Sequence, residues 1–338
     1  MIDFIFQKLK PKLSHHCIVL SLLILFTNYS HATDLSVSVQ GNLSVFNGKI
    51  VNQYSKPVSL AGPSLFWSNE GREGEKFYSA QTVKAFKQDW NATIIRAAMA
   101  AQGEGSYLTH PDSNRKKVER VVEAAIENDM YVIIDWHSHH AEENVEEAIK
   151  FFTEMALKYG NHANVIYEIY NEPLQDTDWH KTIKPYSEQL ISAIRKIDPD
   201  NLIIVGTQTW SQDVDKAAID PILNQTNLAY SLHFYAGTHK TDLRKKAQLA
   251  LDAGLALFVS EWGTVNANGD GDIDRESTEA WLEFINKNKL SHCSWSVTNK
   301  KENSAISKPN VTSLGPWNDE QLTDNGKYLK SIISRWKQ

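Results

Sequence analysis

Two glutamates that follow apolar, strand-like runs could carry out acid and nucleophile chemistry in this sequence. Glu172 is the last residue but one of the run NVIYEIYNEP at 164–173, in which Pro173 stops strand pairing. Glu261 follows the apolar part of a second run, LALFVSEWG at 255–263. Two acids at the ends of two strands, each flanked by aromatic or amide side chains, suit a general acid working with a nucleophile. A single glutamate at a strand end is more often a solvated loop residue, so the pair must be judged with the rest of the chain.

The elements that must position these acids alternate regularly along the chain. Short apolar runs predict strands over 58–61, 93–97, 131–136, 165–170, 202–206, 229–234, 257–261 and 291–296. Amphipathic runs predict helices over 80–90, 115–128, 142–159, 180–197, 213–223, 239–253, 276–288 and 319–336. This order predicts an α/β fold, a single (β/α)8 barrel over 33–338, with a short N-terminal β-hairpin within 35–58. A doubly wound open sheet is the alternative, but no Gly-x-Gly-x-x-Gly follows the first strand.

The predicted strand ends carry aromatic, imidazole, guanidinium or carboxylate side chains. They are Phe66, Trp67, Arg96, Trp136, His137, His139, His140, Asn171, Glu172, Trp210, His233, Tyr235, Glu261, Trp262 and Trp295. The carboxyl ends of barrel strands meet at one rim, where barrel enzymes hold their active sites. Two acids among tryptophans suit a sugar, because one face of a pyranose stacks on an indole while its hydroxyls bond to amides and carboxylates. The pattern therefore favours a carbohydrate site.

Two stretches could instead bind a metal. The first holds His137, His139 and His140, but neighbouring residues point apart in an extended segment, and no His-Glu-x-x-His helix is present. The second is the loop 266–274 (NANGDGDID), which resembles the start of a calcium loop; its twelfth position is Ser277 and not a bidentate glutamate. We expect a polar active-site loop there, with calcium left open, and no metal or cofactor in catalysis.

Charge and the N-terminus limit the partners and the location. A net charge of −6 without a basic stripe argues against nucleic acid. Three lysines within the first twelve residues precede the apolar run 18–26, which predicts a signal peptide over 1–32, cleaved near Ala32; an uncleaved anchor is the alternative. Cleavage leaves Cys293 as the one cysteine, so no internal disulfide can form. We expect a secreted monomer, extracellular or periplasmic, free of the membrane and without a carbohydrate-binding module.

Five short motifs stand at five of the predicted strand ends. They are IIRAAM at 94–99, IIDWH at 133–137, IYNEP at 169–173, SLHFY at 231–235 and VSEWG at 259–263. Together they resemble the secreted bacterial endo-β-1,4-glucanases of glycoside hydrolase family 5, over roughly residues 40–336. The resemblance implies endo-acting, retaining hydrolysis of β-1,4-glucosidic bonds in cellulose and related β-glucans. The same chemistry on mixed-linkage glucan, xyloglucan or mannan is an alternative, and a non-catalytic sugar-binding barrel is a remote one.

The resemblance also implies a role for each matching residue. Glu172 would be the general acid and base, and Glu261 the nucleophile. Supporting positions would be Arg96, His137, Asn171, His233 and Tyr235. Substrate-binding positions would be Trp67, Trp210, Trp295, Lys300 and Glu302. These roles imply that Arg96 and Tyr235 keep Glu261 ionised, and that this negative charge raises the pKa of Glu172.

Overall fold

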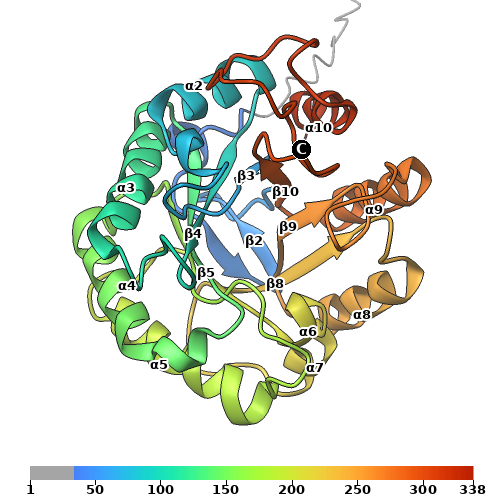
Figure 1. The fold of residues 1–338 in the computed structure, drawn as a ribbon. Helices are drawn as coiled ribbons and strands as arrows, with labels where there is room; N and C mark the ends of the chain where they lie inside the picture. Colours follow the sequence, from blue (N-terminus) through green and yellow to red (C-terminus); the bar gives the residue numbers. More distant parts are fainter. Residues whose placement is uncertain (1–33, 338) are drawn as a thin grey trace, which may run out of the picture. The chain divides into compact units, whose positions relative to one another are not determined.

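The computed structural model describes residues 34–337, so the predicted signal peptide lies outside the described residues. Eight parallel strands close into a barrel in the order β10-β3-β4-β5-β6-β7-β8-β9 (Figure 1). They are β3 (Ala61–Leu65), β4 (Ile94–Ala100), β5 (Tyr131–His137), β6 (Val165–Glu168), β7 (Ile203–Val205), β8 (Leu228–Tyr235), β9 (Leu257–Gly263) and β10 (His292–Val297). The predicted (β/α)8 barrel is confirmed, and the open sheet is excluded.

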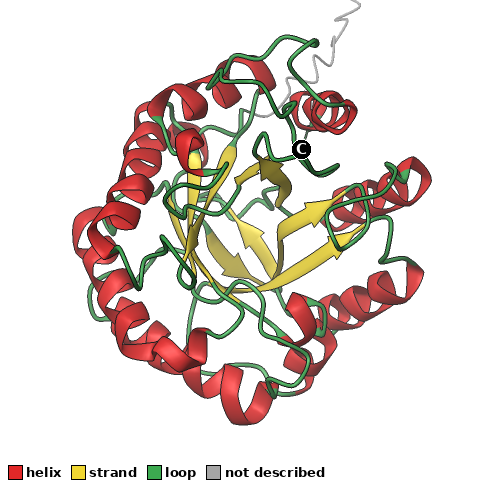
Figure 2. Cartoon of the chain, in the orientation of Figure 1, coloured by secondary structure: helices red, strands yellow, loops and turns green. Residues whose placement is uncertain are grey.

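Helices surround the barrel and connect successive strands (Figure 2). They are α2 (Ala80–Trp90), α3 (Pro111–Glu127), α4 (Val145–Tyr159), α5 (Lys184–Arg195), α6 (Gln208–Ser211), α7 (Val214–Ile219), α8 (Thr241–Asp252), α9 (Arg275–Asn288) and α10 (Asp324–Arg335), with short turns η1 (Glu75–Phe77), η2 (Ala141–Asn144) and η3 (Trp179–Ile183). Helix α2 has the predicted bounds, because the Ser79 side chain caps its start by accepting from Thr82 N–H and Asn91 ends it with φ 52°.

The segment before the barrel matches the predicted hairpin only in part. Strands β1 (Ser44–Phe46) and β2 (Lys49–Val51) pair antiparallel as expected. The alternating run LSVSVQ at 35–40, which lies within the segment predicted to form the hairpin, instead contains helix α1 (Val37–Gln40). Its start is fixed by a distant carboxylate, since Asp129 Oδ1 accepts from Ser38 N–H at 2.8 Å. The first barrel strand also begins at Ala61 and not at Val58, whose N–H instead donates to Ile50 of the hairpin at 3.0 Å.

The barrel interior has an apolar layer beneath a charged one. The apolar layer belongs to one cluster of buried side chains, which includes Val58, Leu60, Ile94, Tyr131, Ile133, Ile166, Leu202, Ile204, Ala229, Phe258 and Cys293. Side chains on a strand alternate between its two faces, so the residue two positions further on shares the interior. Arg96 follows Ile94 in this way, and Glu168 follows Ile166. The strands therefore place charged groups directly above a dry apolar base.

Gly62 in β3 offers a test of this packing. A Cβ at Gly62 would lie 1.7 Å from the carbonyl oxygen of Ile94. Because backbone would have to move, we expect Gly62→Ala to lower the free energy of unfolding by about 3 kcal/mol or more. Gly71→Ala is the control: its φ is +75°, but a Cβ there has nothing within 4 Å, so only backbone strain of about 1–2 kcal/mol arises. Urea unfolding measures both variants, and equal losses would contradict the close contact.

Candidate active site

Glu172 and Glu261 face each other at the C-terminal mouth of the barrel. Glu261 belongs to β9, and Glu172 follows the end of β6. One carboxylate oxygen of each and one ring nitrogen of His233 all lie within 4.8 Å of one another. Retaining glycoside hydrolases hold their carboxyl groups about 5–5.5 Å apart, whereas inverting enzymes need about 6.5–9.5 Å. The observed approach fits the retaining geometry.

Arg96 lies fully buried behind the acid pair and contacts several strands at once. Its Nη1 donates to Glu261 Oε2 at 2.9 Å, and its Nε donates to Glu168 Oε2 at 2.6 Å. Its Nη2 lies 2.9 Å from Asp135 Oδ2 and donates to Asn171 Oδ1 at 2.6 Å. Burial acts to lower the pKa of Arg96, but the three carboxylates raise it well above its usual value. The guanidinium is therefore a permanent positive charge at the base of the site.

Glu261 is held by one further donor. The Tyr235 hydroxyl donates to Glu261 Oε1 at 2.8 Å. Burial and the neighbouring Glu261 charge raise the pKa of Tyr235 well above its usual value, so the phenol stays protonated and remains a donor. The two contacts expected for Glu261, with Arg96 and Tyr235, are both present. Each carboxylate oxygen is thus fixed by a different donor.

Glu172 has a different partner, His233, and the expected rise in the pKa of Glu172 is wrong. His233 Nδ1 lies 3.0 Å from Glu172 Oε1. Burial acts to raise the pKa of Glu172, but the hydrogen bond and positive charge of His233 lower it below its usual value. Burial also opposes charge on His233, yet the carboxylates of Glu168 and Glu172, 3.7 and 3.0 Å from its ring nitrogens, raise its pKa to about 9. A cation in hydrogen-bond contact outweighs the carboxylate of Glu261 across the site.

His137 is a neutral group on the opposite side of the site. Its Nδ1 lies 2.8 Å from Asp135 Oδ2, and burial lowers the pKa of His137 to about 3. Its ring stacks on Trp295 with centroids 5.4 Å apart and planes 4° apart, and Trp67 lies 5.5 Å away. His137 therefore orients two tryptophans and bears no charge at neutral pH.

Two cavities meet at the acid pair and form one cleft. The first, of about 530 Å³, includes Trp210, and the second, of about 240 Å³, includes Trp67 and Trp295. Both are lined by His139, Glu172, Tyr235, Glu261, Ala267 and Asn268. Trp210 is 38% exposed, so its ring is accessible. A polymer could cross the acid pair with a tryptophan on each side.

Nearly all the predicted site residues line this cleft. Lys300 and Glu302 lie together in the second cavity, where the Lys300 ammonium pairs with the Glu302 carboxylate. Arg96 and Asn171 are the exceptions: both are fully buried, Arg96 holds Glu261, and Asn171 accepts a hydrogen bond from Arg96. The structure thus brings all the predicted positions to one end of the barrel.

Sequence reasoning missed the buried acids Asp135 and Glu168 as parts of the site. Each stands two positions after an inward-facing isoleucine, Ile133 or Ile166, in an otherwise apolar strand. That spacing was the available signal, because a carboxylate inside a barrel must have a buried partner.

The three histidines weighed as metal ligands do not share one point. His137 bonds to Asp135, His139 lies 3.6 Å from a Glu172 oxygen, and His140 lies 3.8 Å from oxygens of Glu142 and Glu143. Among the described residues, His140, Glu142 and Glu143 do place possible ligand atoms within 4.8 Å, but the side chains of His140 and Glu143 are 44% and 65% exposed. The three histidines therefore do not converge on one site.

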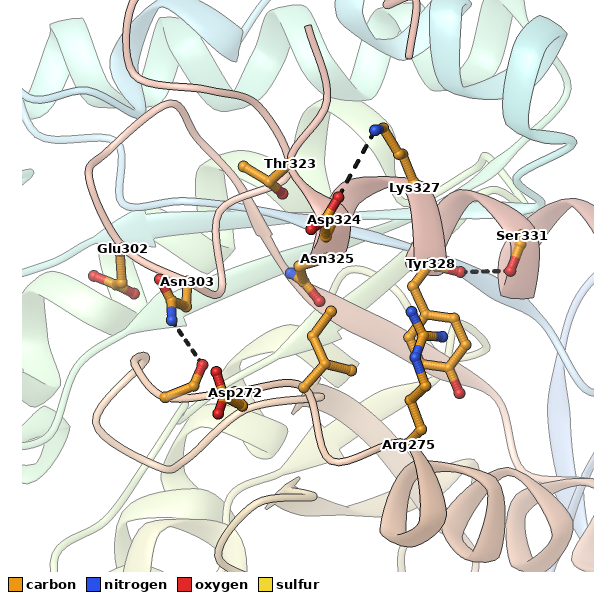
Figure 3. A pocket seen from close by; sticks show the side chains of 12 residues that line it. Asp272, Arg275, Glu302, Asn303, Thr323, Asp324, Asn325, Lys327, Tyr328 and Ser331 are labelled. Atoms are coloured by element: carbon orange, nitrogen blue, oxygen red, sulfur yellow. Dashed lines mark hydrogen bonds and ion pairs between the residues drawn. The ribbon is translucent and has the colours of Figure 1, made fainter. Parts of the chain in front are cut away.

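The loop 266–274 belongs to the cleft wall, as the preferred interpretation had it. Ala267 and Asn268 line both cavities. Asp270 Oδ1 accepts from Asn303 N–H at 3.2 Å, and Asp274 caps α9. These carboxylates have separate protein partners. Residues 271–273 of the loop also line another pocket, of about 660 Å³ (Figure 3). Of the residues that line this pocket, only Glu302 also lines the cleft.

A (β/α)8 barrel with two close carboxylates at its C-terminal mouth defines a glycoside hydrolase architecture. The family model for cellulase (glycosyl hydrolase family 5) matches residues 51–301. Endoglucanase Z of Dickeya dadantii (strain 3937) is 57% identical over 290 residues, which cover 86% of this chain and 66% of that protein. An endoglucanase of Clostridium saccharobutylicum is 41% identical over 316 residues, 92% of this chain and 69% of that protein.

A solved structure agrees with these sequence relatives. The catalytic domain of Thermobifida fusca endoglucanase Cel5A, in complex with cellotetraose, has a TM-score of 0.82 and 30% identity. The match covers 88% of this chain and 98% of that one. This chain belongs to glycosyl hydrolase family 5. It spans about two thirds of the length of the two curated relatives.

The pKa of His233 predicts a pH-dependent stability. Since its pKa is raised from 6.5 to about 9 in the folded protein, its contribution is fully present below pH 6.5 and is lost as pH rises through about 9. We expect the wild type to exceed His233→Gln in free energy of unfolding by about 3 kcal/mol more at pH 6 than at pH 10. Urea titrations at both pH values measure this, and a difference independent of pH would refute the buried imidazolium.

Proposed function

We propose that this protein hydrolyses internal β-1,4-glucosidic bonds of cellulose and related β-glucans with retention of configuration. The close acid pair with unlike partners is the observation that carries this function: Glu261 has a permanent cation beside it, whereas Glu172 has a titratable one. The relatives named endoglucanase and the cellotetraose bound by the Thermobifida enzyme support a β-1,4-glucan as substrate.

In the first step, Glu261 attacks the anomeric carbon and forms a glycosyl-enzyme. Glu172 protonates the glycosidic oxygen, so that the leaving sugar departs as an alcohol. In the second step, Glu172 takes a proton from water, which attacks the same carbon and releases Glu261. Two displacements at one carbon restore the starting configuration.

The residues around the acids can orient the sugars. Asn171 is buried, and Arg96 fixes its Oδ1, whereas its Nδ2 has no hydrogen-bond partner among the described residues. That free donor can bind the 2-hydroxyl of the reacting sugar, a bond that strengthens in the transition state. Trp295 provides a stacking surface beside it, and Trp67 and Trp210 extend the stacking to both sides.

We infer that the protein acts outside the cytoplasm, where its polymeric substrate is. The signal peptide pattern over 1–32 supports export, although it lies outside the described residues. Over residues 34–337, the helices are too short or too polar to cross a membrane.

Reducing-sugar release tests the substrate and the acids together. We expect the wild type, in chelator, to release sugar from carboxymethyl cellulose and lichenan. We expect Glu172→Ala and Glu261→Ala to lose about 100-fold or more, because each removes a group that acts in the transition state. Wild-type activity confined to mannan would overturn the substrate but not the chemistry. Activity that survives in both variants would overturn the site.

Azide separates the nucleophile from the acid. Glu261→Ala leaves space for azide to attack an activated aryl glycoside from the vacated side, so we expect partial rescue and a glycosyl azide of inverted configuration. Azide with Glu172→Ala is the control and should give retained configuration, because Glu261 still reacts first. NMR of the products assigns the anomers, and no rescue of Glu261→Ala, or retained product from it, counts against Glu261.

A further inference from the structure

Three successive residues after β7 adopt left-handed backbone angles. They are Thr209, Trp210 and Ser211, with φ values of 61°, 53° and 56°. Residues with a side chain rarely adopt such angles, and a threonine, which branches at Cβ, adopts them least readily. This conformation costs free energy, so it persists only where neighbouring groups hold it. The left-handed turn (209–211) is therefore fixed by its surroundings and not by local preference.

The left-handed turn is bonded to the residues on both sides of Glu172. Trp210 N–H donates to the carbonyl oxygen of Pro173 at 2.8 Å, and the Ser211 hydroxyl donates to the carbonyl oxygen of Asn171 at 2.8 Å. Asn171 precedes Glu172 in the chain, and Pro173 follows it. The turn and the acid thus belong to one hydrogen-bonded unit, which gives the Trp210 ring a fixed place relative to Glu172.

A buried carboxylate also holds the turn. The Thr209 hydroxyl donates to Asp213 Oδ2 at 2.8 Å, and the Asp213 side chain is 6% exposed. Lys246 of α8 lies 2.6 Å from Asp213 Oδ1, and Lys216 of α7 lies 2.7 Å from its Oδ2. Helices α7 and α8 lie side by side (Figure 1). Burial acts to raise the pKa of Asp213, but the two lysines and Thr209 lower it below its usual value. Asp213 is therefore an ionised acceptor anchored by two helices.

Trp210 belongs to the cavity that receives the leaving sugar. In the proposed mechanism the reacting sugar lies beside Trp295, which lines the second cavity together with Trp67. The first cavity, which Trp210 lines, lies on the other side of the acid pair and therefore takes the sugar beyond the broken bond. Asp213 lies outside the lining of both cavities, so it can affect that sugar only through other residues.

We propose that Thr209 and Asp213 are positioning residues: their hydrogen bond fixes the left-handed turn, and the turn holds the Trp210 ring in place for stacking on the leaving sugar. This inference rests on the proposed function. A ring that is fixed before the substrate arrives loses no freedom on binding, so its stacking energy appears in full as affinity. Without the bond, the turn relaxes toward ordinary backbone angles, the indole moves, and the leaving sugar binds more weakly.

Two substrates separate this role from a general loss of structure. Cellopentaose places sugars in both cavities, whereas β-cellobiosyl fluoride has only fluoride as its leaving group. For Thr209→Val, which keeps the shape but loses the hydroxyl, we expect KM for cellopentaose to rise about 10-fold and kcat to stay within about threefold, because stacking is present before and during cleavage. On the fluoride we expect kcat/KM within about twofold of the wild type. Asp213→Ala should give the same pattern, and Thr209→Ser, which keeps the donor, should restore wild-type binding.

Thr207 provides the matched control. It precedes the turn, its φ is −117°, and its hydroxyl donates to the carbonyl oxygen of Ser231 at 3.2 Å. Thr207→Val removes a hydroxyl from the same segment but leaves the bond between Thr209 and Asp213, so we expect wild-type kinetics on both substrates. If Thr207→Val raises KM for cellopentaose as much as Thr209→Val does, the loss of any hydroxyl loosens the segment and the inference is overturned.

A double-mutant cycle shows whether Thr209 acts through the ring. Thr209 also lines the first cavity, so a direct contact with the sugar must be distinguished. In the Trp210→Ala background we expect Thr209→Val to raise KM by no more than about twofold, because the ring that it positions is absent. A rise as large as that in the wild-type background would contradict the positioning role.

Fluorine NMR of protein labelled with fluorotryptophan reports on the ring without turnover. The Trp210 signal is the one that is missing from Trp210→Ala. We expect it to shift in Thr209→Val and Asp213→Ala but not in Thr207→Val, and an unmoved signal in the first two variants would refute the inference. If Trp210→Ala itself keeps the wild-type KM for cellopentaose, the proposed function of this cavity fails, and the inference with it. If only the Thr209 and Asp213 variants keep it, the positioning role alone is wrong.

Discussion

The burial of the Arg96 guanidinium is the constraint on which the rest of this site depends. An unpaired buried cation costs several kcal/mol, so the barrel must supply partners from several strands. It does so with Asp135, Glu168 and Glu261, together with the amide of Asn171. Each partner is thereby held in one orientation. The same contacts that make the buried charge tolerable also aim Glu261 at the cleft.

The charged layer works because an apolar layer lies beneath it. Residues such as Ile133, Ile166 and Phe258 fill the base of the barrel and exclude water from below. In such surroundings a hydrogen bond or ion pair is stronger than in water, and its donors need not reorganise during the reaction. The order of residues within each strand, apolar first and charged two positions later, builds both layers at once.

The sequence predicted the features that follow from the repeated alternation of strands and helices. It missed the features that depend on contacts between residues far apart in the chain. Eight alternations of strand and helix were enough to predict the barrel. Because parallel strands have their carboxyl ends at one rim, the residues at those ends could be predicted to lie together. The alternating run before the barrel became α1 because Asp129, far along the chain, binds Ser38. The predicted direction of the pKa shift of Glu172 was also wrong, because the shift depends on a 3.0 Å contact with His233 that strand order does not specify.

The two counter-ions suit the roles proposed for the two glutamates. Glu261, the proposed nucleophile, has beside it an arginine, whose guanidinium does not lose its proton. An acid and base must gain and lose a proton in each turnover, which requires a partner that can do the same. Histidine is such a partner, and it faces Glu172. The separation of the two carboxylates alone therefore does not distinguish the proposed nucleophile from the proposed acid; their unlike cations do.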